Sequence, residues 1–179
     1  MNFKQFFSEK FNFNKLSAPF QVKWYQAAPN IWRSSFAYDE AEGNVSSNVK
    51  KKNDVYDVNV EYIVNPYDKN SPLADVSASN SSPVKHEPYW WIDFESRVWG
   101  TSTSSNMGAS VKNARLILKT VISILAEKIP VGDNISFTSG ADQESKISLY
   151  TLLANTLAKQ HVKHVDVIPY EEEVYFFVH

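Results

Sequence analysis

The chain has 179 residues, 43% of them hydrophobic and 14% aromatic, which suits a single domain with its own core and excludes two full-sized domains. Its formal net charge of -2 excludes a global electrostatic attraction to nucleic acid or to an anionic membrane surface. Because there is no cysteine, disulfides, thiolate catalysis and cysteine-based metal sites are excluded too.

The first 16 residues are set apart by a row of phenylalanines at helical spacing, Phe3, Phe6, Phe7 and Phe11. This spacing predicts a short amphipathic helix in an N-terminal arm, residues 1–16. A helix of this length is marginally stable alone, so it either packs on its own domain or docks on a partner. Residues 17–179 are expected to form one domain.

The first part of that domain alternates between strands and polar loops. Residues 19–39 contain two alternating segments separated by Pro29 and Asn30, which predicts a hairpin. Residues 40–54 are polar, include three consecutive lysines, and predict a flexible loop. Residues 54–64 have the clearest strand pattern, and the Pro- and Ser-rich residues 65–87 predict a long surface loop.

The second part introduces the helices. Residues 88–99 predict a strand, and an apolar stripe from Val111 to Ile129, stopped at Pro130, predicts a long central helix. A short strand at 133–139, a second helix ending near His161 and two short strands follow. The order predicts an α+β fold: an antiparallel or mixed β-sheet with both long helices on one face.

The two long strands also bring acidic residues together. Tyr56, Val58 and Val60 alternate with polar residues, which predicts one core face and one solvated face. If the strands pair, four carboxylates gather on the polar face: Asp57, Glu61, Asp93 and Glu95. Such a cluster suits Mg²⁺ or Mn²⁺ and a phosphoesterase or nuclease. The alternative is a solvated face with cross-strand charge pairs, including Arg97, and we expect no metal and no cofactor.

Four short motifs stand out within residues 89–160: the strand "YWWIDF", the helix "NARLILKTVISIL", the strand "ISFTS" and the helix start "SKISLY". Together they resemble an uncharacterised family of tailed-bacteriophage proteins. The residues that match the family pattern are Thr101, Gly108, Thr120, Val121, Ile135, Phe137, Ser145, Leu149 and Tyr150. Lys146 stands where the family usually has Arg. The resemblance implies a phage-encoded accessory or virion-associated protein and implies no chemistry.

Aromatic residues favour a role in protein binding. Tyr25, Trp32, Trp91 and Trp99 are expected to be exposed, and Trp and Tyr are common anchors of protein interfaces. The sequence therefore predicts a non-enzymatic interaction protein that binds a protein partner or assembles with itself. The residues expected to carry binding are Trp91, Trp99, Phe3, Phe6, Phe7, Lys146 and Tyr150.

The other candidate sites have ordinary structural explanations. His161 and His164 are expected to interact with a helix C-terminus rather than to bind metal. The polar segment 101–110 suits a helix cap better than a phosphate site. Lys50, Lys51 and Lys52 leave local nucleic-acid contact as a minor alternative. Without a signal peptide or an apolar span, the protein is expected in the host cytoplasm or the virion, and not in a membrane.

Overall fold

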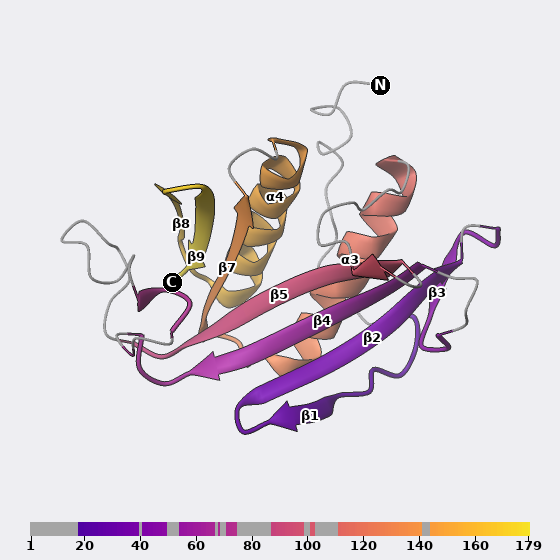
Figure 1. Cartoon of the computed structure of the whole chain (residues 1–179), viewed down its shortest axis with the longest axis horizontal. Helices are drawn as coiled ribbons and strands as arrows, with labels where there is room; N and C mark the ends of the chain where they lie inside the picture. The colour runs from indigo at the N-terminus through magenta and orange to yellow at the C-terminus, as the bar shows by residue number, and fades with distance from the viewer. Residues whose placement is uncertain are drawn as a thin grey trace.

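The chain is described by a computed structural model, whose elements are labelled in Figure 1. It describes residues 18–39, 41–49, 54–66, 68, 71–74, 87–98, 101–102, 111–140 and 144–179. For residues 97–98, 101–102, 111–115 and 144–146 it describes the backbone alone. The predicted arm, residues 1–16, and the lysines at 50–52 lie outside the described residues.

The described strands form one mixed sheet in the order β1-β2-β4-β5-β7-β9-β8, with β3 beside β2 and β6 beside β5. The strands are β1 (Tyr25–Ala28), β2 (Ile31–Asp39), β3 (Asn44–Ser46), β4 (Asp54–Ile63), β5 (Tyr89–Val98), β6 (Thr101–Ser102), β7 (Asn134–Gly140), β8 (Val165–Tyr170) and β9 (Glu173–Val178). The helices are α3 (Val111–Lys128) and α4 (Glu144–His161). The predicted α+β class is confirmed.

A hairpin at each end of the sheet and a crossover between them account for much of this order. The predicted first hairpin joins β1 to β2, and Asn30 in its turn has a φ of 63°, a left-handed conformation that Asn tolerates. β8 and β9 form the closing hairpin. Between them, β5 pairs with β7 in parallel, which requires a long connection, and α3 provides it. That one parallel pair makes the sheet mixed.

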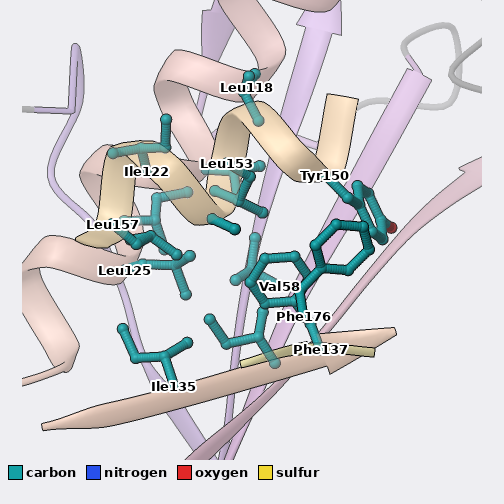
Figure 2. Packing of buried hydrophobic residues seen from close by; sticks show 14 of the residues in the cluster. Val58, Leu118, Ile122, Leu125, Ile135, Phe137, Tyr150, Leu153, Leu157 and Phe176 are labelled. Atoms are coloured by element: carbon teal, nitrogen blue, oxygen red, sulfur yellow. The ribbon is translucent and has the colours of Figure 1, made fainter. Parts of the chain in front are cut away.

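The main core lies between the sheet and the two helices. Figure 1 shows α3 behind the long strands β2, β4 and β5, and α4 beside β7 and the β8–β9 hairpin. Tyr56, Val58 and Val60 face this core, as the alternation predicts. Figure 2 shows Phe137 and Phe176 under α4, and it shows Leu125 and Leu157 of the two helices packed toward Ile135 of the sheet. Each such side chain contributes roughly 1.5–3 kcal/mol on full burial.

Helix α3 is central, as its wide apolar surface predicts. Ile117, Val121 and Ile124 are fully buried. Two polar residues, Thr120 and Ser123, are buried among them, and their hydroxyls donate to the carbonyls of the preceding turn, of Leu116 at 2.8 Å and of Lys119 at 2.9 Å. These bonds offset the cost of burying a hydroxyl, so the buried part of the helix includes polar positions, while Lys119 and Ala126, seven residues apart, are exposed.

Two predicted loops contain more structure than their composition indicates. Part of the expected flexible loop at 40–54 forms β3, which pairs with the end of β2. Within the expected loop at 65–87, Leu73 is fully buried and the hydroxyl of Ser71 hydrogen-bonds that of Tyr89 at 2.7 Å. Tertiary pairing and burial therefore override the polar local sequence at both places.

Helix α4 ends at His161, as predicted. The next residue, Val162, has a backbone conformation that suits valine poorly. The N–H of Lys163 donates to the carbonyl of Ala158 at 2.9 Å, the six-to-one bond of a Schellman motif. This motif places Val162 in the left-handed region, with a φ of 55° and a side chain that is 89% exposed. Glycine normally occupies this position, since a β-branched residue there is strained.

We therefore expect Val162→Gly to stabilise the protein. The exposed valine side chain loses almost no burial, and relief of the left-handed strain exceeds the added chain entropy of glycine. The expected gain is about 0.5–1 kcal/mol in the free energy of unfolding, measured by denaturant titration. Val131→Gly, at another exposed valine, controls for the loss of a surface side chain. A destabilised Val162→Gly variant would contradict the assignment of strain.

Candidate interaction surface

The pairing of β4 with β5 places the predicted polar residues on one face of the sheet. Asp57 is opposite Glu95, Asn59 is opposite Asp93, and Glu61 is opposite Trp91. The side chains between them point to the helices, so this second face carries neither α3 nor α4. The prediction that these strands pair and gather carboxylates on one face is confirmed.

Part of this face is a hydrogen-bonded polar network. The Nε of Arg33 donates to the Oδ1 of Asn59 at 2.6 Å, and the Nδ2 of Asn59 reaches the Oδ2 of Asp93 at 3.4 Å. In the next row the hydroxyl of Ser35 donates to a carboxylate oxygen of Asp57. The described contacts thus link the strands through the neutral amide of Asn59, which connects Arg33 to Asp93. The expected charge pairing by Arg97 falls on a side chain that is not described.

The expectation that this whole face is solvated is wrong at Asp57, which is 0% exposed. A buried carboxylate needs hydrogen-bond partners, and Ser35 provides one. The metal hypothesis also lacks support here: in the part of the chain that the structure describes, no three acidic or histidine side chains come close enough to hold an ion. The four carboxylates are distributed along two strands instead of converging.

Beside this polar network lies a second apolar cluster, which we call the Trp91 surface. Its residues come from β4, β5, β8, β9 and the segment 71–74, and neither helix contributes. The buried members are Ile63, Leu73, Tyr89 and Phe177, and the partly exposed members are Trp91, Ile168, Tyr170 and Tyr175. The predicted interface residue Trp91 therefore lies in an apolar patch that spans several strands.

Hydrogen bonds and ring contacts hold this surface in place. Tyr89 packs edge-on against Phe177 with ring centroids 6.2 Å apart, and Tyr170 packs against Tyr175 at 6.5 Å. Burial raises the pKa of Tyr89 to about 12, so its hydroxyl stays protonated while it bonds to Ser71. The aromatic side chains are fixed by the fold before any partner binds.

Sequence reasoning identified Trp91 and missed its neighbours, although a signal was present. The runs "YWWI" in β5 and "VYFFV" in β9 are apolar at consecutive positions, so they place apolar side chains on both faces of the sheet. Leu73 could not be found in this way, because it is a single apolar residue in a polar segment.

The structure corrects the prediction for Tyr150. Its side chain was expected to lie outside the apolar stripe of α4 and to contribute to binding. Instead it is only 6% exposed, packed edge-on against Phe137 at 5.6 Å and Phe176 at 6.1 Å between ring centroids (Figure 2). Tyr150 is a core residue, so it is not an accessible anchor. Burial correspondingly raises its pKa.

The structure does not describe the side chains of the other predicted binding residues, so it does not place them in the Trp91 surface. Lys146 lies in the first turn of α4, where the side chain is not described. Trp99, Phe3, Phe6 and Phe7 lie outside the described residues. Of the segment 101–110, the structure describes Thr101 and Ser102, which form β6 beside β5.

Trp32 was also expected to be exposed, and it is partly buried on the helix face. Its ring packs at 5.6 Å from that of Trp90, and the ammonium of Lys128 lies 3.7 Å from its centroid. Lys128 is at the end of α3, and desolvation lowers its pKa. This cation–π contact completes the packing at that end of the sheet.

Tyr25, the other aromatic residue of the first hairpin that was expected to be exposed, is 70% exposed, as predicted.

The two histidines near the end of α4 differ from each other. His161 is 4% exposed, and its Nδ1 accepts a hydrogen bond from the N–H of Gly132 at 3.3 Å. An accepting Nδ1 carries no proton. Burial lowers the pKa of His161, with Lys163 acting in the same direction and Asp133 in the opposite one. The expectation of a cationic partner for the helix C-terminus is therefore wrong for His161, while His164 is exposed.

No protein-family model, curated protein or solved structure matches this chain in comparisons with known proteins. Among the residues described, neither helix is both long and apolar enough to cross a membrane.

We expect the stability of the protein to fall below about pH 6.5 because of His161. The unfolded side chain takes up a proton near its ordinary pKa of 6.5, while the folded one resists protonation. Its contribution is therefore present above 6.5 and is lost as the pH falls below that value. Denaturant titrations from pH 7.5 to 5 measure this loss, and His161→Gln is expected to reduce the slope. The matched control is His164→Gln, and an NMR titration that places His161 at or above 6.5 would refute the assignment.

Proposed function

We propose that this chain is a non-enzymatic interaction protein encoded by a tailed bacteriophage, which assembles into a larger complex through the Trp91 surface. The phage assignment is supported by the resemblance over residues 89–160. The binding function is supported by the second apolar cluster, which lies on the sheet face that carries no helix.

One observation carries this proposal. Trp91, Ile168, Tyr170 and Tyr175 are partly exposed members of one cluster, although the elements that carry them, β5 and the β8–β9 hairpin, are distant in the sequence. Apolar patches with rigid Trp and Tyr side chains and a polar rim are typical of protein interfaces. Here the polar rim is the network of Arg33, Asn59 and Asp93.

The second hypothesis, a metal-dependent phosphoesterase or nuclease, has less support. It needs Asp57, Glu61, Asp93 and Glu95 to converge on an ion. Asp57 is fully buried against Ser35, and Asn59 holds Asp93 within the polar network. No observation on the described residues favours catalysis over binding.

We expect the purified chain to self-associate, and Trp91→Ser to weaken that association. A tryptophan at the centre of an interface typically contributes 2 kcal/mol or more, which corresponds to an increase of about 30-fold or more in the dissociation constant. Size-exclusion chromatography with light scattering measures the mass, and sedimentation velocity over a concentration series measures the constant.

The control for this experiment is Val131→Ser, since Val131 is 76% exposed in the loop between α3 and β7 and lies outside the Trp91 surface. Circular dichroism of each variant separates loss of binding from loss of fold. A wild-type chain that stays at 20.4 kDa at all concentrations would contradict the proposal.

A further inference from the structure

We propose that the Trp91 surface receives the phenylalanine-rich segment 1–17 of a second copy of this chain. The inference rests on the proposed function, because it names the partner of the same surface. In such an assembly each copy donates its N-terminal segment to the outer sheet face of a neighbour, so the interface is formed by an exchanged arm.

Charge complementarity supports this partner. Segment 1–17 contains Lys4, Lys10 and Lys15 against Glu9, which gives it a net charge of +2. Because the whole chain has a charge of -2, the remaining residues carry -4. On the same face, β4 and β5 carry the four carboxylates Asp57, Glu61, Asp93 and Glu95, of which Asp57 is fully buried. The described cation beside them is Arg33 of β2. A basic segment is therefore attracted to this face and oriented on it.

The carboxylates also surround the aromatic anchor. Glu61 is directly opposite Trp91, and Asp93 follows it on the same face of β5. Phenylalanines interleaved with lysines match this arrangement, because apolar side chains can fill the patch while the ammonium groups reach the carboxylates. Recognition of an amphipathic helix by an apolar surface uses the same spacing of anchors, i, i+3, i+4, that Phe3, Phe6 and Phe7 show.

The place where the described chain begins favours docking of segment 1–17 on a second copy over docking on its own molecule. Phe20, Val22 and Trp24 pack against the main core, on the helix side of the sheet. Phe20 stacks on Phe36, with ring centroids 6.3 Å apart. The described chain therefore begins on the face opposite to Trp91. To dock on the Trp91 surface of the same molecule, segment 1–17 would have to pass around the edge of the sheet, and docking on a neighbour has no such requirement.

The segment is large enough for a stable interface. Seventeen residues span about 25 Å as a helix. A buried aromatic side chain removes about 150–250 Å² from water, so four phenylalanines remove about 600–1,000 Å². With an equal area on the receiving surface, one docked segment buries about 1,200–2,000 Å², the size of an ordinary specific interface.

The test is a complementation experiment with two full-length variants. An arm variant carries Phe3→Ser, Phe6→Ser and Phe7→Ser, and a surface variant carries Trp91→Ser. Each variant alone is expected to be monomeric at concentrations where the wild type associates. In an equimolar mixture, the intact arm of the surface variant docks on the intact surface of the arm variant. A species of twice 20.4 kDa is therefore expected only in the mixture.

Two further variants make the result specific. Tyr170→Ser, at a partly exposed position of the same cluster, replaces Trp91→Ser if that variant fails to fold. Asn12→Ser, which lies on the opposite side of the predicted helix from Phe3, is a control within the segment and is expected to leave the mass unchanged. Light scattering measures every combination at the same total concentration.

The outcomes separate this inference from the proposed function. If the arm variant associates like the wild type while the surface variant is monomeric, the Trp91 surface binds something other than this segment, and the inference is overturned alone. A mixture that stays monomeric while the wild type associates overturns donation between copies. A photoreactive amino acid at position 6 that cross-links Trp91 within one chain would do the same. A monomeric wild type overturns both.

Discussion

The pairing of β4 with β5 is the constraint on which the rest of the structure depends. Nine consecutive residue pairs, from Val55 opposite Arg97 to Ile63 opposite Tyr89, set the register of the two longest strands. A shift by one residue would turn Asp57 and Glu61 toward the helices and Val58 and Val60 toward the outer face. The strong alternation in β4 makes that shift costly, because it would bury two carboxylates among apolar side chains. The register therefore defines both the core and the interaction surface.

The sheet edges help to explain why a face, rather than an edge, is available for binding. His164 and His179 exchange both backbone hydrogen bonds, so hydrogen-bonded and non-hydrogen-bonded pairs alternate along β8 and β9. The backbone groups of Val165, Val167 and Pro169 therefore point away from β9, toward the free edge of the sheet. Proline has no N–H to offer at its outward position, which shortens the row of donors that another strand could use. Pairing of copies through this edge is therefore limited.

Local sequence predicted the elements well and their tertiary roles less well. The alternation in β4 and the apolar stripe of α3 have one interpretation each, because both patterns are long. β3 was missed because three polar-flanked residues carry no periodicity, and only pairing with β2 makes them a strand. The parallel pairing of β5 with β7 was left open, since it depends on how the connection through α3 crosses the sheet.

The candidate site residues also include one that local sequence identified and others that it misjudged. Trp91 could be identified because it lies among acidic residues on the polar face of a two-faced strand. Tyr150 misled the prediction, which drew the apolar stripe of α4 through Leu152. The spacing of Tyr150 with Leu153 and Leu157, i, i+3 and i+7, indicates the buried face on which Phe137 and Phe176 receive it. His161 misled it too: a histidine in the last turn of a helix is commonly cationic, and only the loop between α3 and β7 makes it a buried acceptor. In each case the deciding neighbour comes from a distant part of the chain.

In the assembly that we propose, the Trp91 surface would combine two kinds of interaction that act at different stages of association. Charge attraction between a basic segment and the acidic outer face acts over about 10 Å at ordinary ionic strength, so it favours encounter and orientation. Burial of aromatic side chains acts only on contact, and it determines how long a complex lasts. Because Tyr89 and Phe177 hold the apolar part in place before binding, little conformational entropy is lost there. In the proposed assembly, the residues that close the second core cluster would also hold the binding surface in place, so folding and assembly would depend on one set of contacts.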